Sequence, residues 1–225
     1  LMKRYGQLPL ITSDLGTNHD YSSDKKATVS EIAGQILADC DAAIATEDSE
    51  AYSYVYRTQQ WGMATKALAP AIRSETATYV ISPLMGDGGY TADQALEIAA
   101  DALAKVLSND YSLWTTASAG YNAYASYFLY NPEDMRAQDK ETIYGGTRTA
   151  VWSSCGVPIV SGSATAGTCP TQEVVDDYEM TNGKPAITSY ADDQQLKPVI
   201  NAGSGYDGTK PYEGRDPRFY ATVFY

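Results

Sequence analysis

Three stretches in the first half of the sequence repeat apolar residues at helical spacing. They lie at 28–46, 57–81 and 92–109. In each stretch apolar residues recur three and four positions apart, which is the period of an amphipathic α-helix. The connection at 85–90 is short, so we expect the second and third helices to pack antiparallel. The sequence therefore predicts a mainly α fold built from antiparallel helical pairs.

Two of these helices are expected to begin at a capping box. Thr28 is followed three residues later by Glu31, and Thr91 by Gln94. In this pattern the Thr side chain and the Glu or Gln side chain each accept a hydrogen bond from the other residue's backbone N–H. Pro70 lies inside the middle stretch. There it is expected to kink the helix or to weaken its first half, because it lacks an N–H and clashes with the preceding turn.

The second half of the sequence predicts irregular structure with short strands. Residues 145–168 are rich in Gly, Ser and Thr, which predicts an exposed loop. Residues 140–144 read KETIY, and 219–225 are rich in aromatic and β-branched residues. Both segments are predicted to be strands. The segment 191–210 is predicted to be a polar loop, and 174–180 a short helix or the start of a strand.

The change in composition divides the chain near residue 119. We expect residues 1–119 to form a scaffold of tetratricopeptide-like helical pairs, although no repeat of fixed period is visible. Residues 120–225 are expected to form an irregular capping part that carries the ligand site. The predicted fold class is therefore mainly α, with a capping subdomain that contains short strands.

The C-terminal stretch 212–225 reads YEGRDPRFYATVFY and concentrates opposite charges around Pro217. Arg215, Asp216 and Arg218 are predicted to lock a turn, because the planar guanidinium group suits paired carboxylates. We expect this turn to begin the last strand and to fasten the capping part to the helical scaffold. It is interpreted as a structural feature and not as a binding site.

Charge and residue counts exclude several classes of function. The net charge of −12 argues against binding to nucleic acid, whose phosphates require Lys and Arg. His19 is the one histidine, which excludes a His-rich zinc site and argues against a Cys/His site. No cofactor is predicted. Cys155 and Cys169 flank the Gly/Ser/Thr-rich loop and are candidates for a disulfide, which spacing alone does not establish. Chance pairs among 28 acidic residues keep a glycosidase open as an alternative.

The aromatic residues favour a recognition surface. The chain has 19 Tyr and 3 Phe, and Tyr suits surfaces that are apolar on one side and wet on the other. Flat aromatic faces beside amides or carboxylates are typical of sugar binding. For Trp114 we favour core packing. The candidate ligand-binding residues are Trp152, Tyr144, Tyr130, Asn131 and Tyr127. For each of them core packing is the alternative.

Several segments together resemble one known family. RYGQLPLI at 4–11, PTQEVVDDYEMTNGKP at 170–185 and the stretch at 212–225 are similar, in order and distance, to segments of the SusD/RagB family. The family consists of outer-membrane nutrient-binding lipoproteins. The resemblance covers nearly all of this chain, but it corresponds to only the middle part of a family member. It therefore implies one incomplete SusD-like domain.

The resemblance implies a function without catalysis. Such a protein binds glycan at the cell surface and delivers it to a SusC-like TonB-dependent transporter in the outer membrane. It is held there by an N-terminal lipid anchor that is absent from this chain. The alternatives are a protein-interaction scaffold or peptide-binding lid, and a glycoside hydrolase.

Overall fold

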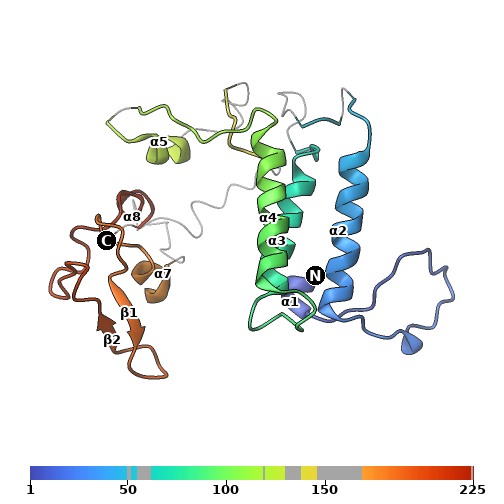
Figure 1. Ribbon diagram of the computed structural model, residues 1–225, viewed down its shortest axis with the longest axis horizontal. Helices are drawn as coiled ribbons and strands as arrows, with labels where there is room; N and C mark the ends of the chain where they lie inside the picture. The colour runs from blue at the N-terminus through green and yellow to red at the C-terminus, as the bar shows by residue number, and fades with distance from the viewer. Residues whose placement is uncertain (50–51, 55–61, 119, 130–137, 146–168, 224) are drawn as a thin grey trace, which may run out of the picture. The chain divides into compact units, whose positions relative to one another are not determined.

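The computed structural model describes residues 1–49, 52–54, 62–118, 120–129, 138–145, 169–223 and 225. Within these ranges the chain is mainly helical, as predicted, with a single two-stranded sheet. It divides into two compact units (Figure 1). The first unit comprises residues 1–114 and 131–147, and the second comprises 115–130 and 148–225. The predicted boundary between a helical scaffold (1–119) and a capping part (120–225) stays a prediction.

The first unit is built around three long helices. They are α2 (Val29–Ala45), α3 (Leu68–Val80) and α4 (Ala92–Leu107). The short helix α1 (Met2–Tyr5) and a 3-10 helix at Tyr21–Ser23 precede them. In Figure 1 α3 lies beside α2 and α4 and runs antiparallel to both, which confirms the predicted helical pairing. Within the described ranges, no helix has both the length and the apolar character needed to cross a bilayer.

Both predicted capping boxes are present. The backbone N–H of Thr28 donates to Glu31 Oε2 at 2.8 Å, and Thr28 Oγ1 accepts from Glu31 N at 3.2 Å. At the start of α4, Thr91 N donates to Gln94 Oε1 at 2.9 Å, and Gln94 N donates back to Thr91 Oγ1 at 3.2 Å. Because a capping box depends on residues three positions apart, the starts of α2 and α4 could be predicted from the sequence alone.

The predicted helix at 57–81 is shorter in the structure. Residues 57–61 lie outside the described ranges, 62–67 form turns, and α3 begins at Leu68. Pro70 therefore occupies the first turn of α3. The N–H groups of a first turn have no partner within the helix, so a proline there removes no helical hydrogen bond. The predicted kink at Pro70 is therefore wrong, whereas the other alternative, a weakened first half of the predicted helix, agrees with the non-helical residues 62–67.

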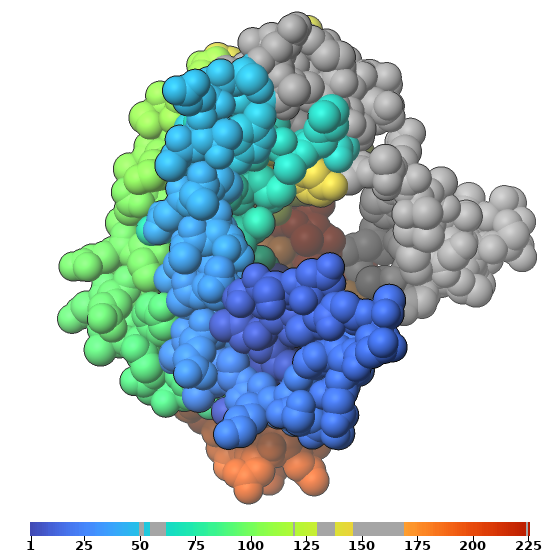
Figure 2. Space-filling view, turned by 90° about the vertical axis from the view of Figure 1, so that its right-hand side faces the viewer, coloured from blue at the N-terminus to red at the C-terminus, as the bar shows by residue number. Residues whose placement is uncertain are grey.

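The N-terminal segment completes the hydrophobic core at one end of the helices. Met2 is buried against Val29, Ile32, Ala33 and Val80, with Leu8 partly buried beside them. Figure 2 shows this segment, in dark blue, lying against α2. At the other end, Ala67 and Val106 pack against Tyr111, whose hydroxyl donates to the carbonyl oxygen of Tyr54 at 2.7 Å.

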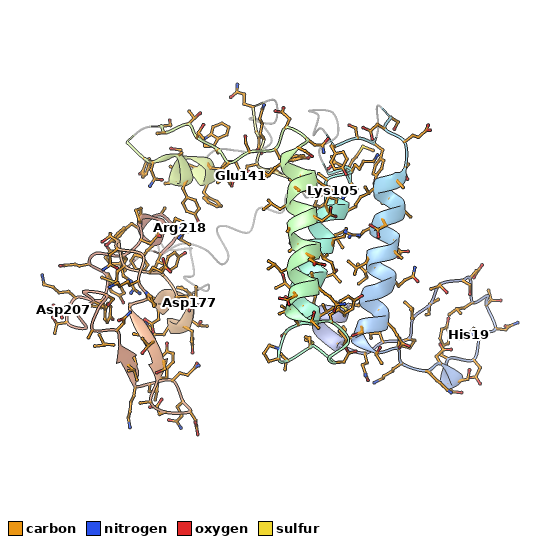
Figure 3. All side chains as sticks on the ribbon, in the orientation of Figure 1. His19, Lys105, Glu141, Asp177, Asp207 and Arg218 are labelled. Carbon is orange, nitrogen blue, oxygen red and sulfur yellow. The ribbon has the colours of Figure 1, made fainter. Side chains whose placement is uncertain are left out.

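The one histidine lies in the loop that follows this N-terminal segment (Figure 3). His19 Nε2 lies 2.7 Å from Asp24 Oδ1, and the imidazole ring meets the edge of Tyr21 with 4.9 Å between the ring centroids. The partners of His19 are therefore residues of its own loop.

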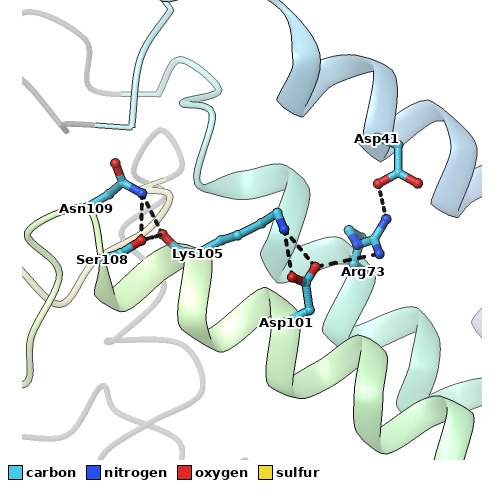
Figure 4. A network of polar contacts seen from close by, with 6 residues as sticks. All are labelled: Asp41, Arg73, Asp101, Lys105, Ser108 and Asn109. Atoms are coloured by element: carbon cyan, nitrogen blue, oxygen red, sulfur yellow. Dashed lines mark hydrogen bonds and ion pairs between the residues drawn. The ribbon is translucent and has the colours of Figure 1, made fainter.

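A charged network joins the three long helices. Arg73 of α3 bonds to the carboxylate of Asp41 on α2, and its Nη2 lies 3.9 Å from Asp101 Oδ2 on α4 (Figure 4). Asp101 also accepts from Lys105 one turn along α4, at 2.7 Å. Since the Arg73 side chain is 12% exposed, this cation is shielded from water and fixed by both neighbouring helices.

The second unit combines short helices with one hairpin. Its elements are α5 (Ala123–Leu129), α7 (Gln172–Asp176), β1 (Ile187–Tyr190), β2 (Pro198–Ile200) and α8 (Pro217–Thr222). The strands pair antiparallel, with Ile187 opposite Ile200. The helix α7 agrees with the helical alternative over 174–176 only, and Met180 at the end of the segment forms an isolated bridge to Arg215. Strand β2 corrects the prediction that 191–210 is all loop.

Both segments predicted as strands on residue type lack strand structure. At 219–222 the chain instead belongs to α8, because Asp216 caps a helix whose first residue is Pro217. At 140–144 the Asp139 carboxylate accepts from Glu141 N at 2.9 Å and Thr142 N at 3.0 Å. These bonds to neighbouring amides hold a turn there instead of an extended conformation.

Candidate functional site

The second unit places two pockets on either side of the contact between α5 and α8. These helices pack together, and Tyr124 of α5 lies 3.5 Å from Thr222 of α8, hydroxyl to hydroxyl. On α8, Pro217, Tyr220 and Ala221 share one face at helical spacing. Arg218 and Thr222 share the adjacent face. Each face lines, or borders, a different hollow.

The first hollow is the aromatic groove, with a volume of about 310 Å³. Three aromatic rings line it, one before α5, one on α5 and one on α8. Phe128 is 64% exposed and Tyr220 46% exposed, so both side chains are accessible to a ligand. The groove is lined by Gly120, Tyr121, Asn122, Ala125, Phe128, Leu129, Pro217, Tyr220 and Ala221.

The rings of α5 support one another edge to face. Phe128 meets Tyr124 with 5.1 Å between ring centroids and Tyr127 with 5.7 Å, at interplanar angles of 64° and 79°. This is a favoured arrangement for aromatic pairs. Asn122 Oδ1 caps the helix by accepting from Ala125 N at 2.9 Å. The groove therefore presents supported aromatic surface beside polar groups.

The second hollow is the polar pocket, with a volume of about 460 Å³. It is lined by Tyr124, Val174, Asp177, Tyr178, Glu179 and Arg218. Figure 3 labels Asp177, which directly follows α7, and Arg218 on α8. Arg218 donates two side-chain hydrogen bonds to the carboxylate of Asp216, from Nε to Oδ1 at 2.9 Å and from Nη2 to Oδ2 at 2.8 Å. This fork, with the Arg218 backbone N–H, lowers the pKa of Asp216 to about 2.

The segments 170–183 and 212–225, which carry residues of both hollows, are joined by backbone hydrogen bonds. Met180 and Arg215 form an isolated antiparallel bridge, Thr181 N donates to Gly214 O, and Asp216 N donates to Glu179 O, the last two at 2.8 Å. Phe219 is fully buried and lies edge-on to Tyr178. The segments 170–183 and 212–225 therefore form one folded base, which fixes where both hollows lie.

The charged turn is locked in a different way from the predicted one. Arg218 pairs with Asp216 as expected. Arg215, 1% exposed, instead bonds to the carbonyl oxygen of Val175 and lies against the rings of Tyr206 and Phe219. These contacts join elements within the second unit. Fastening of the capping part to the helical scaffold stays a prediction.

The predicted binding residues are distributed as follows. Tyr127 is half-buried on α5 and supports Phe128 of the aromatic groove. Tyr144 is 47% exposed and belongs to the first unit. Trp152, Tyr130 and Asn131 lie outside the described residues, as does Cys155 of the candidate disulfide. Each of these assignments stays a prediction. Trp114 is partly exposed, and its backbone N–H donates to Glu141 Oε2 at 2.7 Å.

Sequence reasoning missed the contribution of α8 to both hollows. Read as a strand, residues 219–225 would alternate between two faces and would not bring Tyr220 beside Pro217. The Asp-Pro pair at 216–217 was the available signal, since Asp is a preferred N-cap and Pro a preferred first helical residue. Among the described residues, no group of three His, Cys, Asp or Glu side chains is placed to hold a metal ion.

Hollows lined by aromatic and polar side chains, such as the two in the second unit, are typical of ligand-binding proteins. The sequence matches the SusD family over residues 114–225. On this match the chain belongs to the SusD family, whose members are nutrient-binding proteins of the cell surface and not enzymes. A search of curated proteins finds no match.

Proposed function

We propose that this chain binds glycans at the outer face of the outer membrane and delivers them to a SusC-like TonB-dependent transporter. The observation that carries the proposal is the aromatic groove between α5 and α8, lined by Tyr121, Phe128 and Tyr220. It lies in the part of the chain that matches the SusD family.

The groove has the chemistry that sugar binding needs. One face of a pyranose ring carries C–H groups, and these pack on a flat aromatic ring with little loss of hydration. Asn122 adds an amide beside the rings, which can bond to sugar hydroxyls. Stacking fixes the plane of the sugar, and the polar groups distinguish its hydroxyls.

The delivery step rests on the family. Attachment to the membrane by an N-terminal lipid, and partnership with a barrel transporter, are proposed from membership in the SusD family. The hydrolase alternative is not proposed, because members of this family are binding proteins.

The test is binding to an array of glycans and peptides, followed by calorimetry on the full chain with each ligand that binds. Phe128→Ala and Tyr121→Ala should weaken glycan binding about tenfold or more, since each removes an exposed stacking face. Leu196→Ala is the matched control, because Leu196 is a similarly exposed apolar residue of the same unit that lines neither hollow. Glycan binding unchanged by both aromatic variants would refute this site.

A second candidate, a protein-interaction scaffold, is favoured by one observation in the first unit. An apolar groove of about 490 Å³ lies along α3 and α4, with Leu68, Ile72, Leu103 and Val106 among its lining residues. Ile72 and Leu103 are exposed in this groove, and exposed apolar side chains that gather on one surface are typical of interaction sites. A blank array, together with co-purification of a SusC-like transporter that Leu103→Asp abolishes, would favour the scaffold over the glycan-binding protein.

A further inference from the structure

The polar pocket lies next to the aromatic groove and shares both of its supporting helices. Tyr124 of α5 and Arg218 of α8 line the pocket, while Phe128 and Tyr220 of the same helices line the groove. An oligosaccharide has several linked rings, so a chain held in the groove can extend past α8 into the pocket. The charge of the pocket then affects which sugar units are accepted.

The positive charge in this pocket is already neutralised. Arg218 bonds to both oxygens of Asp216, at 2.9 and 2.8 Å. A guanidinium held in this way by a carboxylate offers little net attraction to a second anion. Arg218 therefore acts as a hydrogen-bond donor at the edge of the pocket and not as a receptor for a sugar carboxylate or sulfate.

Two carboxylates line the pocket, and the cation beside them, Arg218, is shared between Glu179 at longer range and the directly bonded Asp216. Asp177 and Glu179 are exposed, and neither forms an ion pair with any side chain in the described ranges. Together with the neutral Arg218–Asp216 pair, they give the pocket a net negative charge. Carboxylates accept hydrogen bonds from sugar hydroxyls and attract ammonium groups, whereas they repel other carboxylates.

Aromatic surface completes the pocket. Tyr124 and Tyr178 both line it, and Tyr178 is held edge-on against the buried Phe219 with 5.6 Å between ring centroids. A ring fixed in this way can stack on a sugar without first losing much side-chain freedom. Two tyrosines beside two carboxylates form a pocket for a polar, uncharged or cationic ring.

We propose that the polar pocket is a second sugar subsite, which excludes anionic units and prefers a unit with a free amino group over its neutral counterpart. The proposal rests on the proposed function, since it takes the glycan to be bound in the neighbouring groove. It narrows the ligand class to neutral and amino-sugar glycans, with uronic acids and sulfated sugars rejected.

The test compares three oligosaccharides of equal length by calorimetry on the full chain. Their units are glucosamine, N-acetylglucosamine and galacturonic acid, at a pH where the amine is protonated and the carboxylates are ionised. The glucosamine oligomer should bind about two- to fivefold more tightly than the acetylated one, which is the range for exposed ion pairs, and the galacturonate oligomer most weakly.

Variants then show whether the two carboxylates cause this order. Asp177→Asn and Glu179→Gln should each reduce the difference in affinity between the glucosamine and N-acetylglucosamine oligomers. Each should also increase the affinity for the galacturonate oligomer. Asp193→Asn is the control, because it removes one exposed carboxylate of the same unit that lines neither hollow. An order that the two pocket variants leave unchanged, or galacturonate bound as tightly as glucosamine, overturns the proposal.

The same measurements separate this inference from the proposed function. If Phe128→Ala weakens all three ligands while Asp177→Asn changes none, the groove binds glycan and the polar pocket does not select it. If wild-type protein binds none of the three and the glycan array is blank, the proposed function fails and the subsite proposal fails with it.

Discussion

Arg215 donates from Nη2 to the carbonyl oxygen of Val175, 40 residues earlier in the chain, at 2.5 Å. Val175 lies near the end of α7, where carbonyl groups lack partners within the helix. The guanidinium carbon lies 5.4 Å from the ring centroid of Tyr206 and 5.6 Å from that of Phe219. One buried side chain thus joins α7, the loop at Tyr206 and the base of α8.

Arg215→Ala should destabilise the second unit by about 2–4 kcal/mol, because it opens a cavity and leaves the Val175 carbonyl without its donor. Arg215→Met should be less destabilising, since it preserves most of the volume and avoids burying a charge. The measurement is urea unfolding followed by tyrosine fluorescence and near-ultraviolet circular dichroism. Equal stability of the Ala variant and the wild type would contradict this role.

Arg73 should matter more to the first unit than its exposed neighbour Lys105. Arg73→Ala removes a shielded cation that contacts α2 and α4, with an expected loss of about 2 kcal/mol. Lys105→Ala removes an i, i+4 ion pair on α4, with an expected loss below about 0.5 kcal/mol. Thermal unfolding of the two variants would test the order, and similar losses would contradict it.

The Asp216–Arg218 pair should make stability depend on acid pH. Its hydrogen bonds to Arg218 lower the pKa of Asp216 from the usual 3.8 to about 2. The ionised carboxylate therefore stabilises the folded state above about pH 4. This contribution should decrease as the pH falls towards 2.

The variant Asp216→Asn isolates this effect, because Asn also caps a helix N-terminus but does not titrate. The difference in unfolding free energy between wild type and variant should be present at neutral pH and decrease between about pH 4 and 2. A difference that stays constant over this range would show that the pair contributes nothing through its charge.

The capping box of α4 should stabilise its first turn. Thr91→Ala removes the acceptor for Gln94 N and should lower stability by about 1 kcal/mol. Thr91→Ser should retain most of the stability, since Ser offers the same oxygen. Unfolding curves of both variants give the comparison. An alanine variant as stable as the serine variant would be the contrary result.

Features fixed by neighbouring residues were predictable from the sequence. The capping boxes at Thr28 and Thr91 predicted two helix starts. The short connection between α3 and α4 predicted their antiparallel packing. Each of these depends on chemistry within a few residues.

Features decided by longer-range contacts were not predictable in the same way. Phe219 and Tyr220 have high strand propensity, yet Phe219 is buried among Tyr178, Tyr212 and Tyr225 as part of a helix. Propensity for strands is weak compared with burial of this kind. The hairpin of β1 and β2 was missed because its turn lacks the usual glycine and places Gln195 at a positive φ of 56°.

The hollows were the least predictable part of the molecule. Tyr121 and Phe128 meet Tyr220 only after the chain has folded, and about 90 residues separate them in sequence. The same holds for Tyr124 and Asp177 in the polar pocket. Residue type alone pointed to tyrosines as a class, but it did not show which of them share a surface.

The helix α5 has seven residues, and the hydroxyl of its Tyr124 lies 3.5 Å from that of Thr222 on α8. A helix this short is not stable by itself. It should therefore open at a much lower free energy than the base around Arg215, and its amide hydrogens should exchange first. Substitutions in α5 can then change which ligand binds while the base stays folded. The side of the groove that α5 contributes can therefore vary in sequence with little effect on the stability of the second unit.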